Sequence, residues 1–351
     1  MRRAPLWLLV GGCSVAFLAP ALAAHPSGSG RIGDDSGAAL LQRAADAAED
    51  LDYQGTQFVA FWAEAGSTSA IVEVSHVAGE GSVMRLEPTP QNPAGAVLRS
   101  GGPGAPDVVG FDPAALALLK RNYETARTGG DNVAGRAVDV VAVRRPGDSP
   151  VARFWLDRET GLVLRREVLD GDGRTLRASA FIRVTFGPTS DRTMDRATAA
   201  DTPQASGEPL DDAAVAALRD GGWRLPEGLP SGLELFDARL TGAEDESQLH
   251  LTYSDGVSTL SLFQQRGRLD TDSLDGFRRI RVGATKVYAS TTFPRRVVWS
   301  GGGKVFTLVA ECQQDTLEGV IAALPHGEAP RGLRSRLRDG FDRVGSWLNP
   351  F

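Results

Sequence analysis

Residues 136–186 read RAVDVVAVRRPGDSPVARFWLDRETGLVLRREVLDGDGRTLRASAFIRVTF. Runs of Val, Leu, Phe and Ile are separated by the turn sequences Arg145-Pro146-Gly147-Asp148 and Asp170-Gly171-Asp172-Gly173. Short β-prone segments joined by turns rich in Gly and Asp are typical of antiparallel hairpins. This stretch therefore predicts an antiparallel meander.

The residues before this stretch extend the meander. Apolar residues at helical spacing predict a helix over 38–52, and Asp112-Pro113 begins a second helix, with proline at its first position. The proline-rich segment from Pro88 to Asp107 is predicted to be a loop. About seven strands are expected in all, the first three at 53–62, 69–77 and 82–86. Residues 38–187 are interpreted as one domain.

A second β-rich unit is expected beyond residue 209. Residues 188–209 hold Pro, Ser, Thr, Asp and Ala with almost no large apolar residue, which is typical of a linker. Residues 210–326 then show seven strand-like segments between a short helix and a closing helix. The fold class predicted from these patterns is α+β and mostly β.

Both ends of the chain carry segments of a different kind. Residues 1–23 combine Arg2 and Arg3 with an apolar run and a small-residue cleavage pattern, which predicts a signal peptide followed by a flexible linker at 24–37. An uncleaved anchor and a lipoprotein modified at Cys13 remain alternatives. Residues 327–351 form a basic amphipathic helix in the prediction, and it either binds anionic membrane or docks on protein. Its candidate contacts are Arg334, Arg338, Phe341 and Trp347.

Charge and motifs argue against several functional classes. The net charge of −6 does not favour a nucleic-acid binder. The four histidines lack metal-ligand spacing, and neither a phosphate-binding loop nor a Gly-x-Ser-x-Gly elbow is present. We therefore expect no catalytic residue, no metal and no cofactor.

Apolar side chains on both faces of the first strands indicate a binding role instead. Phe58 and Trp62 share one face of their strand, while Val59 and Phe61 share the other. A half-solvated sheet would alternate more cleanly. The second apolar face is either another layer of the same core or a groove for a lipid or acyl chain. The candidate groove residues are Phe58, Trp62, Val72, Val74, Met84 and Leu86.

The order of short motifs along the chain resembles the MucB/RseB family of envelope regulators in the sigma-E pathway. The motifs are Leu51-Asp52-Tyr53-Gln54-Gly55, Asn122-Tyr123, Phe154-Trp155-Leu156-Asp157, Leu169-Asp170-Gly171-Asp172-Gly173, Trp223-Arg224-Leu225-Pro226 and Tyr253-Ser254-Asp255-Gly256-Val257. The resemblance implies an N-terminal domain similar to the LolA and LolB lipoprotein carriers. That domain is a curved, unclosed antiparallel barrel with helices on its concave side, and a smaller C-terminal antiparallel sheet follows it.

The resemblance also implies a function and a location. Family members bind the extracytoplasmic part of an anti-sigma factor and shield it from proteolysis, and lipid or lipoprotein signals loosen that grip. We therefore expect an exported negative regulator of an alternative sigma factor, in the periplasm or on the extracytoplasmic face of the envelope. The alternative is a lipid or lipoprotein carrier. An enzyme is not expected.

Overall fold

The computed structural model describes residues 35–63, 66–86, 96–100, 113–188, 209–242, 247–271, 274, 276–283, 285–290, 295–310 and 312–327. The predicted signal peptide, the tail candidates, most of the 188–209 linker and the helix cap at Asp112 lie outside these residues. Within them, no helix combines the length and apolar character that crossing a membrane requires.

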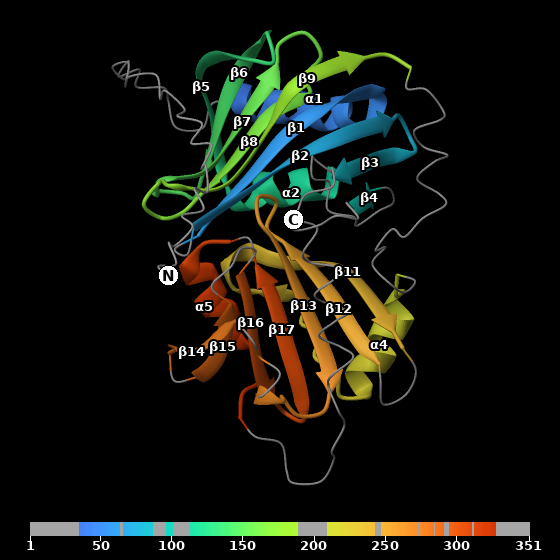
Figure 1. The fold of residues 1–351 in the computed structure, drawn as a ribbon, viewed down its shortest axis with the longest axis vertical. Coiled ribbons are helices and arrows are strands. Elements are labelled where there is room, and N and C mark those ends of the chain that lie inside the picture. Colours follow the sequence, from blue (N-terminus) through green and yellow to red (C-terminus); the bar gives the residue numbers. More distant parts are fainter. Residues whose placement is uncertain are drawn as a thin grey trace, which may run out of the picture. The chain divides into compact units, whose positions relative to one another are not determined.

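The N-terminal half is one nine-stranded antiparallel sheet with two helices (Figure 1). Its strand order is β4-β3-β2-β1-β9-β8-β7-β6-β5, and the end strands β4 and β5 do not pair with each other, so the sheet is unclosed. The elements are α1 (Asp35–Asp50), β1 (Tyr53–Ala63), β2 (Gly66–Val77), β3 (Gly81–Leu86), β4 (Ala96–Ser100), α2 (Pro113–Asn122), β5 (Glu124–Val133), β6 (Arg136–Arg144), β7 (Pro150–Asp157), β8 (Val163–Leu169) and β9 (Thr175–Phe186).

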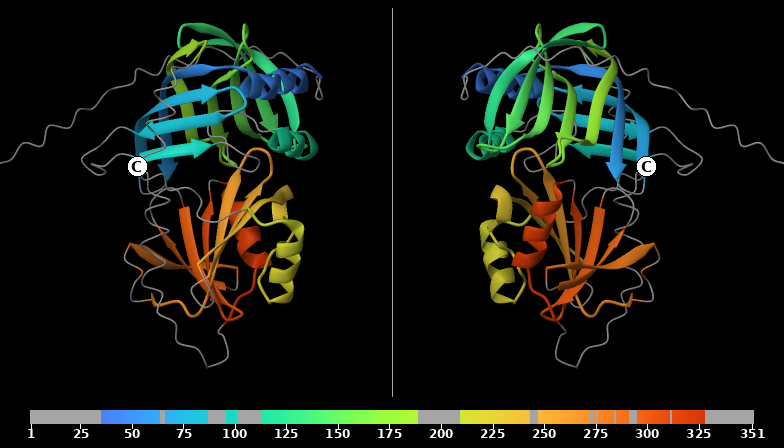
Figure 2. Two further views of the ribbon diagram at one scale, coloured as in Figure 1. Left: turned by 90° about the vertical axis from the view of Figure 1, so that its right-hand side faces the viewer. Right: turned by 90° about the vertical axis from the view of Figure 1, so that its left-hand side faces the viewer.

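Both helices pack on the same face of this sheet, which we call the inner face. Leu41 of α1 and Leu116 of α2 lie in one buried cluster with Val141 and Phe154 of the sheet. The strands curl around the helices (Figure 2), so the apolar stripe of each helix is buried against the sheet. The predicted curved, unclosed sheet with helices on its concave side is confirmed.

Two strand predictions were wrong in this half. The segment from Pro88 to Asp107 was predicted as a loop, but β4 lies inside it and pairs with β3. β5 was not predicted, because its sequence ETARTGGDNV is polar and contains Gly129 and Gly130. As an edge strand, β5 is held mainly by main-chain pairing with β6 and needs few apolar side chains.

The C-terminal half is an eight-stranded antiparallel sheet in the order β10-β11-β12-β13-β17-β16-β15-β14. Helices α4 and α5 lie against one face of it (Figure 2), and Leu317, Val320 and Ile321 of α5 complete its buried core. The elements are α4 (Asp212–Asp220), β10 (Gly228–Leu229), the short helix η2 (Pro230–Gly232), β11 (Leu233–Thr241), β12 (Gln248–Ser254), β13 (Thr259–Arg266), β14 (Phe277–Val282), β15 (Thr285–Ser290), β16 (Arg295–Gly301), β17 (Lys304–Ala310) and α5 (Gln314–Ala323).

Strand β17 ends at Ala310, and Cys312, which follows it, is partly buried where it packs beside the C-terminal core. The two halves of the chain are not separated by contact clustering, which places residues 32–351 in one unit. The domain boundary expected at residues 188–209 therefore stays a prediction.

The tip of the β12–β13 hairpin joins the two halves. Val257 is buried in the same apolar cluster as Leu41, Leu116 and Phe154, although it belongs to the C-terminal half. Arg166 of β8 donates a hydrogen bond to the carbonyl oxygen of Val257. The N-terminal core therefore includes a side chain supplied by the second sheet.

Asp255 at the same tip is only 1% exposed and accepts several hydrogen bonds. Its carboxylate accepts from the Tyr123 hydroxyl at 2.6 Å and from the backbone N–H groups of Val257 at 2.9 Å and Ser258 at 2.6 Å. The Arg145 guanidinium lies 3.7 Å from the same carboxylate. Burial, together with the neighbouring Asp255 charge, raises the pKa of Tyr123, so its hydroxyl keeps the proton that it donates.

Candidate binding surface on the N-terminal sheet

The six predicted groove residues do not lie together. Val72, Val74, Met84 and Leu86 are on the inner face, where they are buried in one cluster with Tyr53, Val59, Phe61 and Phe181. Phe58 and Trp62 lie on the opposite, outer face of β1. The structure therefore places four of the candidates in the core and two on the other side of the sheet.

The outer face carries an exposed apolar patch. Phe58 pairs with Ile71 of β2, and Trp62 follows on the same face of β1. Ile182 of β9 is exposed on the same sheet, at a register shift between the partners of Thr56 and Gln57 where it has no partner on β1. Trp62, Ile71 and Ile182 are 40%, 37% and 55% exposed, and they are the exposed large hydrophobic residues of the described chain. We call these four residues the outer patch.

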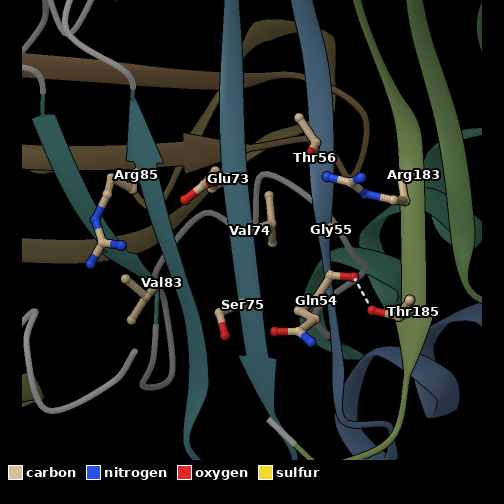
Figure 3. Close-up of a pocket in the computed structure, with 10 residues that line it drawn as sticks. All are labelled: Gln54, Gly55, Thr56, Glu73, Val74, Ser75, Val83, Arg85, Arg183 and Thr185. Atoms are coloured by element: carbon tan, nitrogen blue, oxygen red, sulfur yellow. Dashed lines mark hydrogen bonds between the residues drawn. The ribbon is translucent and has the colours of Figure 1, made fainter. Parts of the chain in front are cut away.

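A polar pocket of about 400 Å³ lies next to the outer patch on the same sheet (Figure 3). Strand register places its lining side chains in two rows. One row crosses four strands as Arg85, Glu73, Thr56 and Arg183. The second row crosses the same strands as Val83, Ser75, Gln54 and Thr185.

The pocket offers both charges and hydroxyl groups to a ligand. Within the described part of the chain, Arg85, Arg183 and Glu73 form no ion pair. Ser75 is 4% exposed, and its Oγ has no hydrogen-bond partner among the described residues. Thr185 Oγ1 already donates to the Gln54 carbonyl oxygen at 3.2 Å (Figure 3). Unpaired guanidinium groups beside a buried hydroxyl suit a polar or anionic group of a ligand.

Sequence reasoning did not find the pocket. Most of its lining residues are polar positions that alternate with apolar ones along β1, β2, β3 and β9, and such positions also occur on any solvated sheet face. Only the strand order, which brings β9 beside β1, places Arg183 near Thr56. The alternation of Thr56, Glu73 and Arg85 with buried neighbours was the available signal.

His76 and His250 are structural in this arrangement. His76 is buried and its Nδ1 lies 2.8 Å from Ser82 Oγ, while its ring stacks on Tyr53. His250 stacks on Phe263, and burial lowers its pKa to about 4. Among the described residues, no group of three or more His, Cys, Asp or Glu side chains is placed to hold a metal ion.

The fold and the outer face define a class: a two-sheet α+β protein whose first sheet encloses helices and presents an apolar patch beside a polar pocket. Comparison with known families adds information on which proteins this chain resembles. The model of the MucB/RseB N-terminal domain matches residues 104–205 of this chain.

Two curated relatives are similar in sequence. The sigma factor AlgU regulatory protein MucB of Pseudomonas aeruginosa is 30% identical over 220 residues, which cover 61% of this chain and 63% of the relative. The sigma-E factor regulatory protein RseB of Haemophilus influenzae is 26% identical over 146 residues, covering 41% and 45%. The chain thus spans less than two thirds of either relative. A crystal structure of MucB in complex with MucA(peri) is 23% identical, with a TM-score of 0.48 over 83% of this chain and 100% of that one.

Proposed function

We propose that this protein is an extracytoplasmic negative regulator of an alternative, sigma-E type sigma factor. It binds the extracytoplasmic segment of an anti-sigma factor and shields that segment from proteolysis. The names of both curated relatives as sigma factor regulatory proteins support the proposal, as does the MucB structure with MucA(peri). Because those relatives carry the names of regulators, we propose a binding role without catalysis.

The observation that carries the proposal is the outer patch. Monomeric proteins rarely leave several large apolar side chains exposed together, and such patches rimmed by polar groups mark protein interaction sites. Trp62, Ile71 and Ile182 meet this description, with the charged pocket beside them. Aromatic residues at the centre of an interface often supply most of the binding free energy.

The proposed location is the extracytoplasmic side of the envelope. The signal-like segment at residues 1–23 supports it, because Arg2 and Arg3 precede an apolar run and a small-residue cleavage pattern. Detection of the protein in the periplasmic or membrane fraction of its native cell tests this location. Recovery in the cytosol alone contradicts it.

The binding proposal is tested with the full chain and the extracytoplasmic segment of a single-pass anti-sigma factor from the same organism. Biolayer interferometry should show binding that the W62A/I182T variant weakens by at least about tenfold. R174Q is the control, because Arg174 lies in an exposed turn and its one ion pair among the described residues is with the neighbouring Asp172. Absence of binding by the unaltered chain, or equal binding by both variants, contradicts the proposal.

A lipid or acylated ligand is the second candidate, since the outer patch also suits an acyl chain and the adjoining arginines suit an anionic headgroup. Native mass spectrometry of protein purified from the envelope should then show a bound acyl species. An empty protein that also ignores fluorescent fatty acids excludes this candidate.

A further inference from the structure

Residues 276–310 carry seven basic side chains and no acidic one, although the whole chain has a net charge of −6. The seven are Arg278, Arg279, Arg281, Lys286, Arg295, Arg296 and Lys304. Four of them fall in the β14–β15 hairpin, which contains one of the three lysines of the entire chain. The hairpin is therefore a local positive surface on an acidic protein.

Strand β14 is an edge of the second sheet. It stands last in the strand order and pairs with β15 on one side only. Within the described residues, no strand pairs with its other side. The N–H and C=O groups of an edge strand that point away from the sheet can pair with a further strand.

The strand register separates the basic side chains of the hairpin onto two faces. Arg279 pairs with Tyr288 and Arg281 pairs with Lys286, so these side chains share a face. The opposite face of β14 carries Ile280 and Val282, which pack against the C-terminal core, and Arg278 is on that side.

Arg279, Arg281 and Lys286 are exposed, and none of them forms an ion pair with another described residue. Like charges on neighbouring strands repel each other, so the face is electrostatically unfavourable without an acidic partner. Arg296 of β16 adds charge nearby, because its guanidinium lies 5.6 Å from the ring centre of Phe277 at the start of β14.

Helix α5 packs near β14 and carries the acidic residues Asp315 and Glu318. Its residues Leu317 and Ile321 join Ile280 and Val282 of β14 in the core.

We propose that the free edge of β14 is a docking strand for an extended acidic peptide segment of a partner protein. The segment would add as a further strand, with acidic side chains at alternate positions opposite Arg279 and Arg281. Its intervening residues would lie on the side of Ile280. The inference does not depend on the regulator role, because it requires only an acidic strand.

The positive charge also selects this occupant over a second copy of the chain. Two β14 edges placed side by side would bring arginine against arginine, which disfavours self-pairing. An acidic strand gains cross-strand ion pairs at the same positions. A role of these cations solely in preventing edge-to-edge association is the competing explanation. It predicts no binding of an acidic peptide.

The test uses the full chain and a fluorescein-labelled peptide of alternating Glu and Val, measured by fluorescence polarisation. The R279Q/R281Q variant should bind this peptide about tenfold more weakly, and R279Q alone should have a larger effect than R278Q. R278Q is the matched control, since it removes the same charge from the same strand on the other face. All three positions are exposed, so the variants should fold normally.

Two further arms separate strand addition from other binding. A peptide of the same charge with alternate backbone amides N-methylated on the pairing side should lose binding, and the unmodified peptide should protect β14 amides from hydrogen exchange. Sedimentation with phosphatidylglycerol vesicles tests a membrane surface as the ligand. Any of four outcomes would overturn the proposal. Two concern the peptide: an equal loss of binding in R278Q and R279Q, or undiminished binding of the N-methylated peptide. The other two are binding to vesicles without binding to peptide, and no binding at all.

Discussion

The Tyr123 hydroxyl donates a 2.6 Å hydrogen bond to the carboxylate of Asp255, and the two residues come from different halves of the chain. Asn122 supports the same contact by donating to the Asp255 carbonyl oxygen at 3.1 Å and to that of Gly232 at 3.0 Å. Both Asn122-Tyr123 and the Asp255-Gly256-Val257 segment were motifs that carried the family resemblance. The structure shows that these motifs form the junction between the two sheets.

Replacement of Tyr123 by Phe should lower the free energy of unfolding by about 1–3 kcal/mol, because the buried Asp255 carboxylate loses a donor. Urea unfolding monitored by tryptophan fluorescence measures the change. Y288F is the control, since Tyr288 is a partly exposed residue of the β14–β15 hairpin. A change in Y123F no larger than that in Y288F would show that the junction does not depend on this bond.

Gly256 should not tolerate a side chain. Its φ is +93°, and a Cβ atom there would lie 2.2 Å from the Leu119 backbone nitrogen and 2.6 Å from the Ala115 carbonyl oxygen. G256A should therefore cost more than the roughly 1 kcal/mol expected for a strained backbone alone. G276A supplies that baseline, because Gly276 has φ +77° with nothing within 4 Å. Equal thermal stability of the two variants would contradict the close approach of Gly256 to α2.

Stability should fall as the pH drops from about 6.5 to 4, and His250 should account for part of the loss. Burial and the nearby Arg239 lower the pKa of His250 to about 4, whereas an unfolded histidine titrates near 6.5. The unfolded state then binds more protons between these values, so acid favours unfolding by up to about 3 kcal/mol. Above pH 6.5 both states hold a neutral ring and the effect vanishes.

The comparison of wild type with H250Q isolates this contribution, since carboxylates titrate in the same range in both proteins. The difference in unfolding free energy between the two should change between pH 7 and pH 4. A difference that stays constant over this range would mean that His250 titrates normally in the folded protein.

The two sets of groove candidates should respond differently to truncation. Met84→Ala and Leu86→Ala remove buried inner-face atoms and should each cost about 2–5 kcal/mol. Trp62→Ala should cost less than about 1 kcal/mol, because that side chain is 40% exposed. Chemical denaturation of the three variants gives the comparison, and a large loss in Trp62→Ala would place that residue in a core.

Local patterns predicted most elements of the fold. Strands β15 and β17 are among the strand-like segments expected in residues 210–326, because their apolar runs are bounded by glycine turns or polar loops. The short helix expected at the start of the second unit is present as Asp212–Asp220, and the Asp211 side chain caps it by accepting from the Ala214 N–H group. β5 could not be predicted in this way, because an edge strand paired through its main chain leaves no apolar pattern.

The binding surface was less accessible to sequence reasoning. Alternation separated Phe58 and Trp62 from Val59 and Phe61, but it could not tell which face the helices cover. Val72 and Val74 thus stood among the groove candidates although they are core residues. The pocket depends on the pairing of β1 with β9, which are far apart in sequence, and no local pattern encodes that pairing.

The side chain of Val257, which belongs to the second sheet, fills part of the hydrophobic core of the first sheet. A single backbone cut anywhere between residues 188 and 209 would consequently yield two fragments that stay associated. Their separation would leave a cavity beside Leu116 and would deprive the Asp255 carboxylate of its hydrogen bond from Tyr123. Neither fragment made alone would regain the full resistance to heat of the intact molecule. Proteolysis at that point would nick this protein without inactivating it by dissociation.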